Sequence, residues 1–201
     1  MNNISLYEYA PTRSARSRWA LLEAGIEYES IGDGPSVFGH PDLGKIHPLR
    51  KVPAAMIDGK PLFESAAICA AIADRVPEKN LIAKPGTWDR SLHDQWVFFV
   101  LTEMESWFFS NLLNIAILPE EQRVSAGIEQ NTAFFKRGAA ALDTVLGEQD
   151  YLVGGQFSVA DIIASFTVNG ARKFGYIKDF PNLQKYLERM FQREHCTLDQ
   201  S

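Results

Sequence analysis

The chain has 201 residues, a formal net charge of −5 and an apolar content of 46%. That length can build one large domain or two small ones, and the apolar content is ordinary for a globular protein. Charges of both signs are scattered, so no basic surface for nucleic acid is predicted. No basic segment followed by an apolar one opens the sequence, and no apolar run is long enough to cross a bilayer. We therefore expect a cytoplasmic protein with neither a nucleic-acid nor a membrane partner.

The chain contains two cysteines and four histidines. Cys69 lies in the apolar run 66–72, where a buried thiol stays protonated and unreactive, so the pattern favours a packing role. The histidines do not have the close spacing of metal ligands, and no cysteine pair accompanies them. We expect no metal site.

Strands and helices alternate over residues 1–80. Strands are predicted at 4–9, 26–31, 54–56 and 62–63, helices at 14–23 and 65–74, and a loop at 32–49. Gly25 fits the position just after the first helix. The resulting order, β-α-β, loop, β-β-α, is expected of a small α/β domain with a mixed sheet.

The alternation stops after a plausible linker at 81–87, and residues 88–201 have helical periodicity throughout. Helical segments are predicted at 88–119, at 120–146, from about 159 and from about 182. Ser158 and Asp161 have the spacing of a capping box at the start of the third segment. A small α/β domain is thus expected to precede an all-helical one.

Residues 51–65 combine features that a hairpin alone does not need. A cis Pro53 would leave the Val52 backbone free to bond an extended peptide, whereas a trans proline at a strand start is the alternative. Ser65 at a helix N-terminus suits a carboxylate and Glu64 suits an ammonium group, although a plain helix cap is the alternative. Lys51 offers a cation to a second carboxylate. Together these residues describe a site for a short peptide with an amino-acid head group.

Two stretches carry a resemblance to a known family, HPLRKVPAAMIDGKPLFESAAI (47–68) and YLVGGQFSVADIIAS (151–165). The first resembles the glutathione-site signature of the cytosolic glutathione transferases, with His47 where Asn is usual. The second resembles the capping-box motif of their helical domain. The resemblance covers nearly the whole chain and implies a thioredoxin-like domain at 1–80, an all-helical domain at 88–201, glutathione as co-substrate and usually a homodimer.

The resemblance also assigns roles to the residues of the first stretch. It implies a cis Pro53, with Val52 pairing to the cysteinyl backbone of glutathione. Glu64 and Ser65 would hold the γ-glutamyl end, and Lys51 would lie near the glycyl end.

Such transferases hold glutathione as a thiolate, because the thiol is a poor nucleophile near neutral pH. The family supplies a hydroxyl or thiol from the loop between the first strand and the first helix. Serine-type members read Ser-Ser-Cys-Ser or Ser-Pro-Asn-Ser there, whereas this chain has Pro11 at the first place. Thr12 is then the first candidate donor to the sulfur and Ser14 the second, although Ser14 also suits a helix N-cap. Tyr9 is a third.

Two further features are open to two interpretations each. Arg13 and Arg16 either raise the local positive potential or are simply solvated. The aromatic run 107–109 is a candidate wall for the second substrate, but such runs more often belong to a core or a dimer interface, which we favour.

The sequence therefore predicts a glutathione transferase that conjugates glutathione to small hydrophobic electrophiles, typically in detoxification. One alternative is glutathione-dependent reduction of disulfides or peroxides. Another is a non-catalytic binding or dimerisation module of the same fold, as in translation-factor subunits. The intact residues at 52–53 and 64–65 favour ligand binding, whereas Pro11 favours the module.

Overall fold

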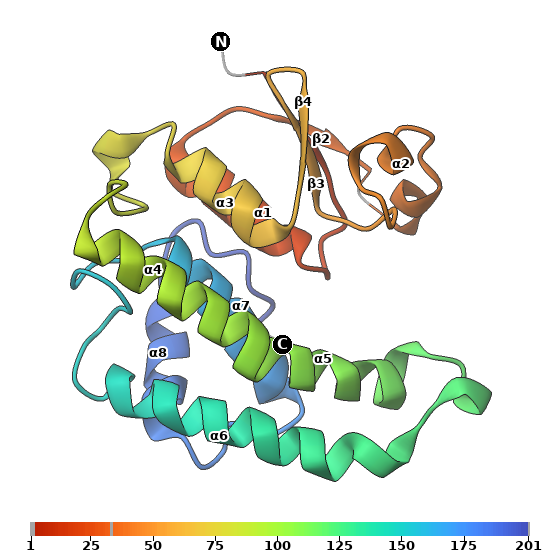
Figure 1. Ribbon diagram of the computed structural model, residues 1–201, viewed down its shortest axis with the longest axis vertical. Coiled ribbons are helices and arrows are strands. Elements are labelled where there is room, and N and C mark those ends of the chain that lie inside the picture. The colour runs from red at the N-terminus through yellow and green to blue at the C-terminus, as the bar shows by residue number, and fades with distance from the viewer. Residues whose placement is uncertain (1–2, 33, 201) are drawn as a thin grey trace. The chain divides into compact units, whose positions relative to one another are not determined.

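A computed structural model describes residues 3–32 and 34–200, and the chain divides into two compact units. The first unit comprises the chain up to Thr87 together with the segment from Arg193 onward. The second unit is Trp88–Gln192. Figure 1 shows the mixed sheet of the first unit and the helices of the second.

The segment 193–201 differs from our expectation, because we assigned it to the helical domain and it groups with the first unit. Arg193 donates two hydrogen bonds to the Glu23 carboxylate, each at 2.8 Å. The Thr197 hydroxyl donates to the Ala15 carbonyl at 2.8 Å. The segment is therefore fastened to the first helix of the chain by side chains that helical periodicity does not reveal.

The described residues of the first unit form a four-stranded sheet and three α-helices. In chain order these are β1 (Ile4–Tyr7), α1 (Ser14–Ala24), β2 (Glu29–Ile31), α2 (Leu43–Ile46), β3 (Ala54–Ile57), β4 (Lys60–Phe63) and α3 (Ser65–Ala73). The strand order is β2-β1-β3-β4, in which β1 and β2 are parallel and the other pairs antiparallel. The parallel pair β1–β2 needs a long crossover connection, which α1 provides. The hairpin β3–β4 completes the sheet on the other side of β1.

Helices cover both faces of this sheet. α1 and α3 lie side by side on one face, and α2 lies on the other (Figure 1). On the α2 side, Tyr7 packs with a cluster of buried residues, Val37, Leu43, Ile46 and Ala54. Alternate residues of β1, Ile4 and Leu6, are buried on the opposite face, as the two-residue period of a strand requires.

The second unit is entirely helical in its regular structure. Its α-helices are α4 (Trp88–Phe99), α5 (Ser106–Leu112), α6 (Ile128–Leu146), α7 (Val159–Lys173) and α8 (Pro181–Phe191). Two π-helical stretches, Val100–Glu105 and Leu113–Ile117, continue α4 into α5 and extend α5. Most of α7 is buried, because it packs against α4 and α8 and against the first π-helical stretch. The predicted fold class, a thioredoxin-like domain followed by an all-helical one, is confirmed.

The predicted helix at 120–146 is shortened at its start, since α6 begins only at Ile128. Residues 120–127 contain two 3₁₀ turns instead, Glu120–Gln122 and Ser125–Gly127. Between those turns, the Val124 backbone N–H donates to the Asn114 side-chain oxygen at 2.7 Å. A bond to a side chain from the preceding helix thus replaces the intrahelical bond that periodicity predicted.

Candidate functional site

The β3–β4 hairpin begins at the Val52–Pro53 bond, which is cis. The β1–β3 ladder ends at the Tyr7–Ala54 pair, so Val52 lies just outside it. Pro53 is buried and Val52 is half-buried. The backbone of Val52 therefore occupies the position next to the sheet that we predicted for contact with an extended peptide.

Glu64 and Ser65 occupy the junction between β4 and α3. Glu64 is exposed and has φ of +71° and ψ of +116°, a conformation that a residue with a side chain rarely adopts. Such strain costs about 1–3 kcal/mol and tends to occur where a side chain or a backbone group must be aimed at a ligand. Ser65 is the first residue of α3 and only 5% exposed. Its backbone N–H is at the positive end of the helix dipole.

His47 lies in the same neighbourhood as Glu64 and Lys51. Burial lowers the pKa of His47, the negative charge of Glu64 opposes that effect and the positive charge of Lys51 adds to it. The imidazole Nδ1 accepts a hydrogen bond from the Leu49 backbone N–H at 3.0 Å. The ring also lies 4.9 Å from the ring of Phe63. The histidine at the place of the usual Asn therefore orders the backbone just before Lys51.

The first loop holds Thr12 and Ser14 in one hydrogen-bonded group with Tyr9. The Thr12 hydroxyl donates to the Tyr9 carbonyl at 2.7 Å and lies 3.0 Å from Ser14 Oγ. Ser14 Oγ accepts from the Tyr9 N–H at 3.2 Å. Thr12 is partly exposed, whereas Ser14 is fully buried. Of the two residues, only Thr12 is partly exposed.

The interpretation of Ser14 as a helix N-cap is wrong. Arg13 occupies the N-cap position and Ser14 is the first residue of α1. The Ser14 N–H donates to Thr12 Oγ1 at 3.2 Å, so Thr12 satisfies a backbone donor at this helix end.

Arg16 is only 1% exposed, so the interpretation of this residue as solvated is wrong. Its guanidinium Nη1 donates to Ser65 Oγ at 3.3 Å and thereby joins α1 to the start of α3. The sequence contained a signal for this burial, because Arg16 precedes the buried Trp19 and Ala20 by three and four positions on α1.

The cysteines are unsuited to nucleophilic chemistry. Cys69 is fully buried, and burial raises the pKa of its thiol to about 12. Burial also raises the pKa of Cys196. Both thiols stay protonated near neutral pH, and the predicted packing role of Cys69 is confirmed.

Phe108, in the middle of the aromatic run 107–109, belongs to the core of the helical unit. It is 7% exposed and its ring contacts those of Phe135, Phe174 and Tyr176 at 5.7–6.1 Å between centroids. The core interpretation that we favoured is therefore confirmed for Phe108.

The capping box of α7 is present as predicted. Asp161 Oδ2 accepts from the Ser158 N–H at 2.9 Å and from its hydroxyl at 3.0 Å. Asp161 Oδ1 accepts from the Leu152 N–H and from the Tyr186 hydroxyl, both at 3.0 Å. Burial raises the pKa of Asp161 to about 6, although these hydrogen bonds oppose the effect. The capping box therefore stabilises the start of α7 and is not a reactive site.

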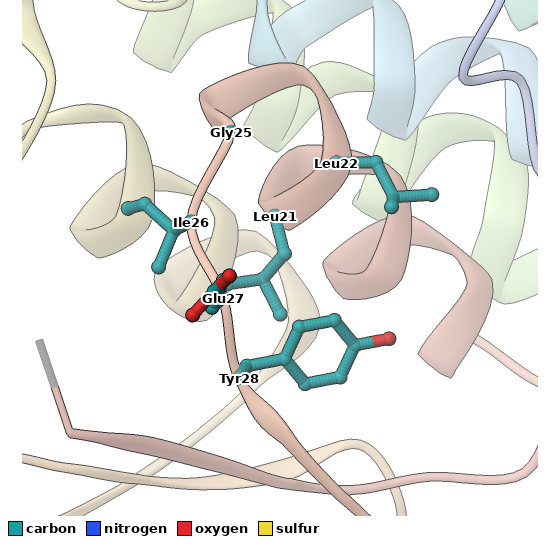
Figure 2. Close-up of a pocket in the computed structure, with 6 residues that line it drawn as sticks. All are labelled: Leu21, Leu22, Gly25, Ile26, Glu27 and Tyr28. Atoms are coloured by element: carbon teal, nitrogen blue, oxygen red, sulfur yellow. The ribbon is translucent and has the colours of Figure 1, made fainter.

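A hollow of about 490 Å³ lies at the C-terminal end of α1 (Figure 2). Its lining consists of Leu21, Leu22, Gly25, Ile26, Glu27 and Tyr28. The Tyr28 hydroxyl donates a hydrogen bond to the Glu8 carboxylate at 3.3 Å. The hollow is open and mostly apolar, and none of the predicted site residues lines it.

All the predicted site residues, Thr12, Ser14, Lys51, Val52, Pro53, Glu64 and Ser65, belong to the first unit. Over the described part of the chain, no helix is long and apolar enough to cross a membrane. The two units thus define a two-domain protein with a thioredoxin-like domain and an all-helical one.

Comparison with known proteins identifies the family. The family model described as "Glutathione S-transferase, N-terminal domain" matches residues 2–74, and that described as "Glutathione S-transferase, C-terminal domain" matches residues 92–194. The chain belongs to the glutathione S-transferase family.

Several relatives agree with this assignment. The chain is 30% identical to Protein LigF of Sphingobium sp., over 90% of this chain and 84% of LigF. A solved structure of a sphingomonad glutathione S-transferase complexed with glutathione superposes with a TM-score of 0.84 at 26% identity, covering 96% of this chain and 94% of that one. The chain is also 31% identical to elongation factor 1-gamma of Prunus avium over 73% of its own length, but spans only 35% of that protein.

Proposed function

We propose that this protein is a glutathione transferase that binds glutathione on its first unit and conjugates it to small hydrophobic electrophiles. The observation that carries the proposal is the junction of β4 and α3. There, a buried serine hydroxyl at a helix N-terminus accepts a hydrogen bond from a buried arginine, and the residue before it has a strained backbone. This arrangement suits the carboxylate and ammonium of an amino-acid head group.

The binding residues that we propose follow from their positions around this junction. Ser65 and Glu64 take the γ-glutamyl end, the backbone of Val52 next to Pro53 pairs with the cysteinyl unit, and Lys51 attracts the glycyl carboxylate. The solved relative with bound glutathione supports a glutathione site in a protein of this fold.

The chemistry requires that the bound thiol lose its proton to solvent and that the thiolate be stabilised. We assign that stabilisation to the hydroxyl of Thr12, a partly exposed residue, with the buried Ser14, whose Oγ lies 3.0 Å from Thr12 Oγ1, as the second candidate. To donate to sulfur, Thr12 gives up its hydrogen bond to the Tyr9 carbonyl. The thiolate then forms a bond to the electrophilic carbon, and a leaving group departs or a proton is taken from water.

Family membership also suggests an oligomeric state and a cellular location. We propose a cytoplasmic homodimer that uses glutathione as co-substrate and needs no metal ion. Light scattering of the purified protein at micromolar concentration tests the dimer, which a monomeric mass would refute.

The decisive experiment is a titration of the purified protein with glutathione, following absorbance of the thiolate against pH. A bound-thiol pKa well below that of free glutathione is the expected result. Absence of binding would refute the proposal and favour a non-catalytic module, which the likeness to elongation factor 1-gamma supports. Binding without a lowered thiol pKa would favour glutathione-dependent reduction of disulfides or peroxides.

A further inference from the structure

β2 lies at the edge of the sheet and, among the described strands, pairs with β1 alone. The Ile31 carbonyl accepts a hydrogen bond from the Glu8 N–H at 3.1 Å, so the backbone groups of Ile31 face β1. Successive residues of a strand direct their backbone groups to opposite edges, so the N–H and C=O of Ser30 point away from β1. Ser30 is also exposed. An edge of this kind can accept a further strand.

The opposite edge of the sheet is protected by its sequence. β4 contains Pro61, which has no N–H to donate, and the exposed Lys60, and both residue types discourage strand addition. β2 contains neither a proline nor a lysine. It is only three residues long, however, so an added strand needs a second contact to be held.

The hollow at the C-terminal end of α1 provides that second contact. Tyr28, which lines it, lies directly before β2 in the chain, and Leu22 and Ile26 add apolar surface. The side chains of Leu22 and Tyr28 extend to the same side in Figure 2. Leu22 is 40% exposed, so part of this apolar lining is accessible to an incoming side chain.

A buried carboxylate fixes the hollow relative to the strand edge. Glu8 is fully buried and accepts from the Tyr28 hydroxyl at 3.3 Å and from the Ser30 hydroxyl at 2.6 Å. Arg18 of α1 donates to the same carboxylate at 2.9 Å. The side chains of Tyr28 and Ser30 therefore lie on the face of the sheet that α1 covers. A strand added beside Ser30 places alternate side chains on that face, next to the hollow.

The charges around this edge indicate the kind of partner. Glu27 lines the hollow and is exposed, and Glu29 is an exposed residue of β2 itself. Pairing of β2 with the β2 of a second copy would bring these carboxylates together from both chains, which is unfavourable. A segment with basic side chains is complementary to them.

We propose that the β2 edge is a docking site for an extended, basic segment of another protein. The segment pairs with the Ser30 backbone, places an apolar side chain in the hollow and brings a lysine or arginine close to Glu27. This inference goes beyond the proposed function, and its test needs no glutathione.

NMR titration of the isotope-labelled protein with acetyl-Lys-Thr-Leu-Thr-Lys-Thr-amide tests the inference. In an extended conformation this peptide has its leucine and both lysines on one face. We expect saturable shifts of amide signals in the segment 21–32. Alanine in place of the leucine should weaken binding at least about tenfold, since most of the apolar burial is lost. No saturable shift at millimolar peptide, or shifts confined to other segments, would overturn the inference.

N-methylation of the peptide tests the backbone pairing itself. The N–H groups of the three threonines point to one edge of the extended peptide, and those of the leucine and lysines point to the other. One of these two sets, when methylated, should abolish binding, whereas methylation of the other should leave binding nearly intact. Equal effects of the two sets would exclude an added strand.

Two protein variants test the seating of the lysines. Glu27→Gln should weaken binding of the peptide about twofold to fivefold, as expected for an exposed ion pair. Glu29→Gln is the matched control, because the Glu29 carboxylate accepts from the Ser5 hydroxyl at 2.8 Å on the opposite face of the sheet. The control should have a smaller effect. Equal losses in both variants would overturn the placement of the basic side chain at the hollow.

Dilution of the protein without peptide tests the competing occupant. We expect the amide signals of residues 28–32 to be independent of protein concentration. Signals that shift on dilution would show that a second copy of this chain occupies the edge, and the proposed partner would be refuted.

Discussion

Thr12 and Ser14 carry the same functional group two positions apart, yet only Thr12 is partly exposed. The Ser14 hydroxyl is fully buried and accepts from the Tyr9 backbone. Thr12 is partly exposed, and its hydroxyl donates a hydrogen bond to the Tyr9 carbonyl. We infer a division of labour in which Ser14 shapes the loop and Thr12 acts on the sulfur.

Replacing Thr12 by Ala should lower kcat about a hundredfold to a thousandfold, the usual effect of removing one donor to a developing anion, while glutathione affinity changes little. Steady-state kinetics with an aryl halide, together with a glutathione titration, measures both quantities. Thr12→Ser keeps the hydroxyl and should keep most of the rate. An unchanged kcat in Thr12→Ala would transfer the role to another group.

Replacement of Glu64 by glycine is expected to change the free energy of unfolding and the affinity for glutathione in opposite directions. Glycine adopts a φ of +71° without strain, so Glu64→Gly should raise the free energy of unfolding by about 1 kcal/mol. The same change removes the carboxylate proposed to hold the ammonium of glutathione, so affinity should fall. Urea unfolding and calorimetry measure the two effects. Glu64→Gln keeps the strained backbone and removes only the charge, and unaltered affinity in both variants would exclude Glu64 from the site.

At the scale of the elements, α6 approaches the first π-helical stretch at a glycine. A Cβ on Gly138 would lie 2.8 Å from Met104 Cγ and 2.9 Å from the Glu103 carbonyl oxygen. The Glu103 carbonyl belongs to the backbone and cannot move aside as the end of a flexible side chain could. The close packing of these two segments therefore depends on the absence of a side chain at Gly138.

Gly138→Ala should therefore destabilise the protein, although the same change in an open helix stabilises by about 1 kcal/mol. The neighbouring Ala140 is exposed, and Ala140→Gly should cost about that amount through helix propensity alone. Thermal unfolding of both variants provides the comparison. A Gly138→Ala protein more stable than the wild type would show that the two segments separate easily.

The capping box at the start of α7 predicts that the free energy of unfolding depends on pH. The pKa of Asp161 is about 6 in the folded protein, well above its value in an unfolded chain. Between about pH 4 and pH 6, folding is therefore accompanied by protonation of Asp161. The contribution of Asp161 to the free energy of unfolding falls by up to about 3 kcal/mol as pH rises through that window.

Asp161→Asn lacks the titrating group, so the stability difference between wild type and variant should be larger near pH 4 than near pH 7. Urea unfolding at several pH values measures it. A difference that stays constant over the window would mean that Asp161 does not titrate there.

Much of the element order could be predicted from periodicity and turn residues, because β1, α1, the hairpin and α3 each depend on their own local pattern. The site residues of the hairpin could be named for the same reason, since they lie within one short stretch. The contact of Arg16 with Ser65 could not be predicted, because the two residues are 49 positions apart in the chain. The bond from Val124 to the Asn114 side chain could not either, because it depends on how the residues between them turn back toward Asn114. The late start of α6 has the same cause.

For the molecule as a whole, the Arg193–Glu23 contact ties the segment 193–201 to α1. Burial works to raise the pKa of Glu23, but the hydrogen bonds from Arg193 and Trp19 outweigh it and hold the pKa below its usual range. A lowered carboxyl pKa contributes stability that is present above the unfolded pKa and is lost as pH falls.

Arg193→Met should therefore lower the free energy of unfolding at neutral pH by about 1.5–3 kcal/mol, the range for hydrogen bonds to charged groups, and by progressively less below about pH 4. Lys45→Met removes the exposed pair with Asp42 and should lower the free energy of unfolding less than Arg193→Met does, because an exposed ion pair is screened by solvent. Chemical unfolding of both variants checks the ranking. Equal losses would mean that the segment 193–201 adds little to the first unit.

The return of the chain to α1 has a consequence for its synthesis. A ribosome releases the amino end first, and domains generally fold as units in that order. Here α1 leaves the exit tunnel long before the segment that supplies Arg193 and Thr197, so the first unit stays unfinished while the entire helical unit is made. The unit that begins to fold first is therefore completed only after the helical unit has been synthesised.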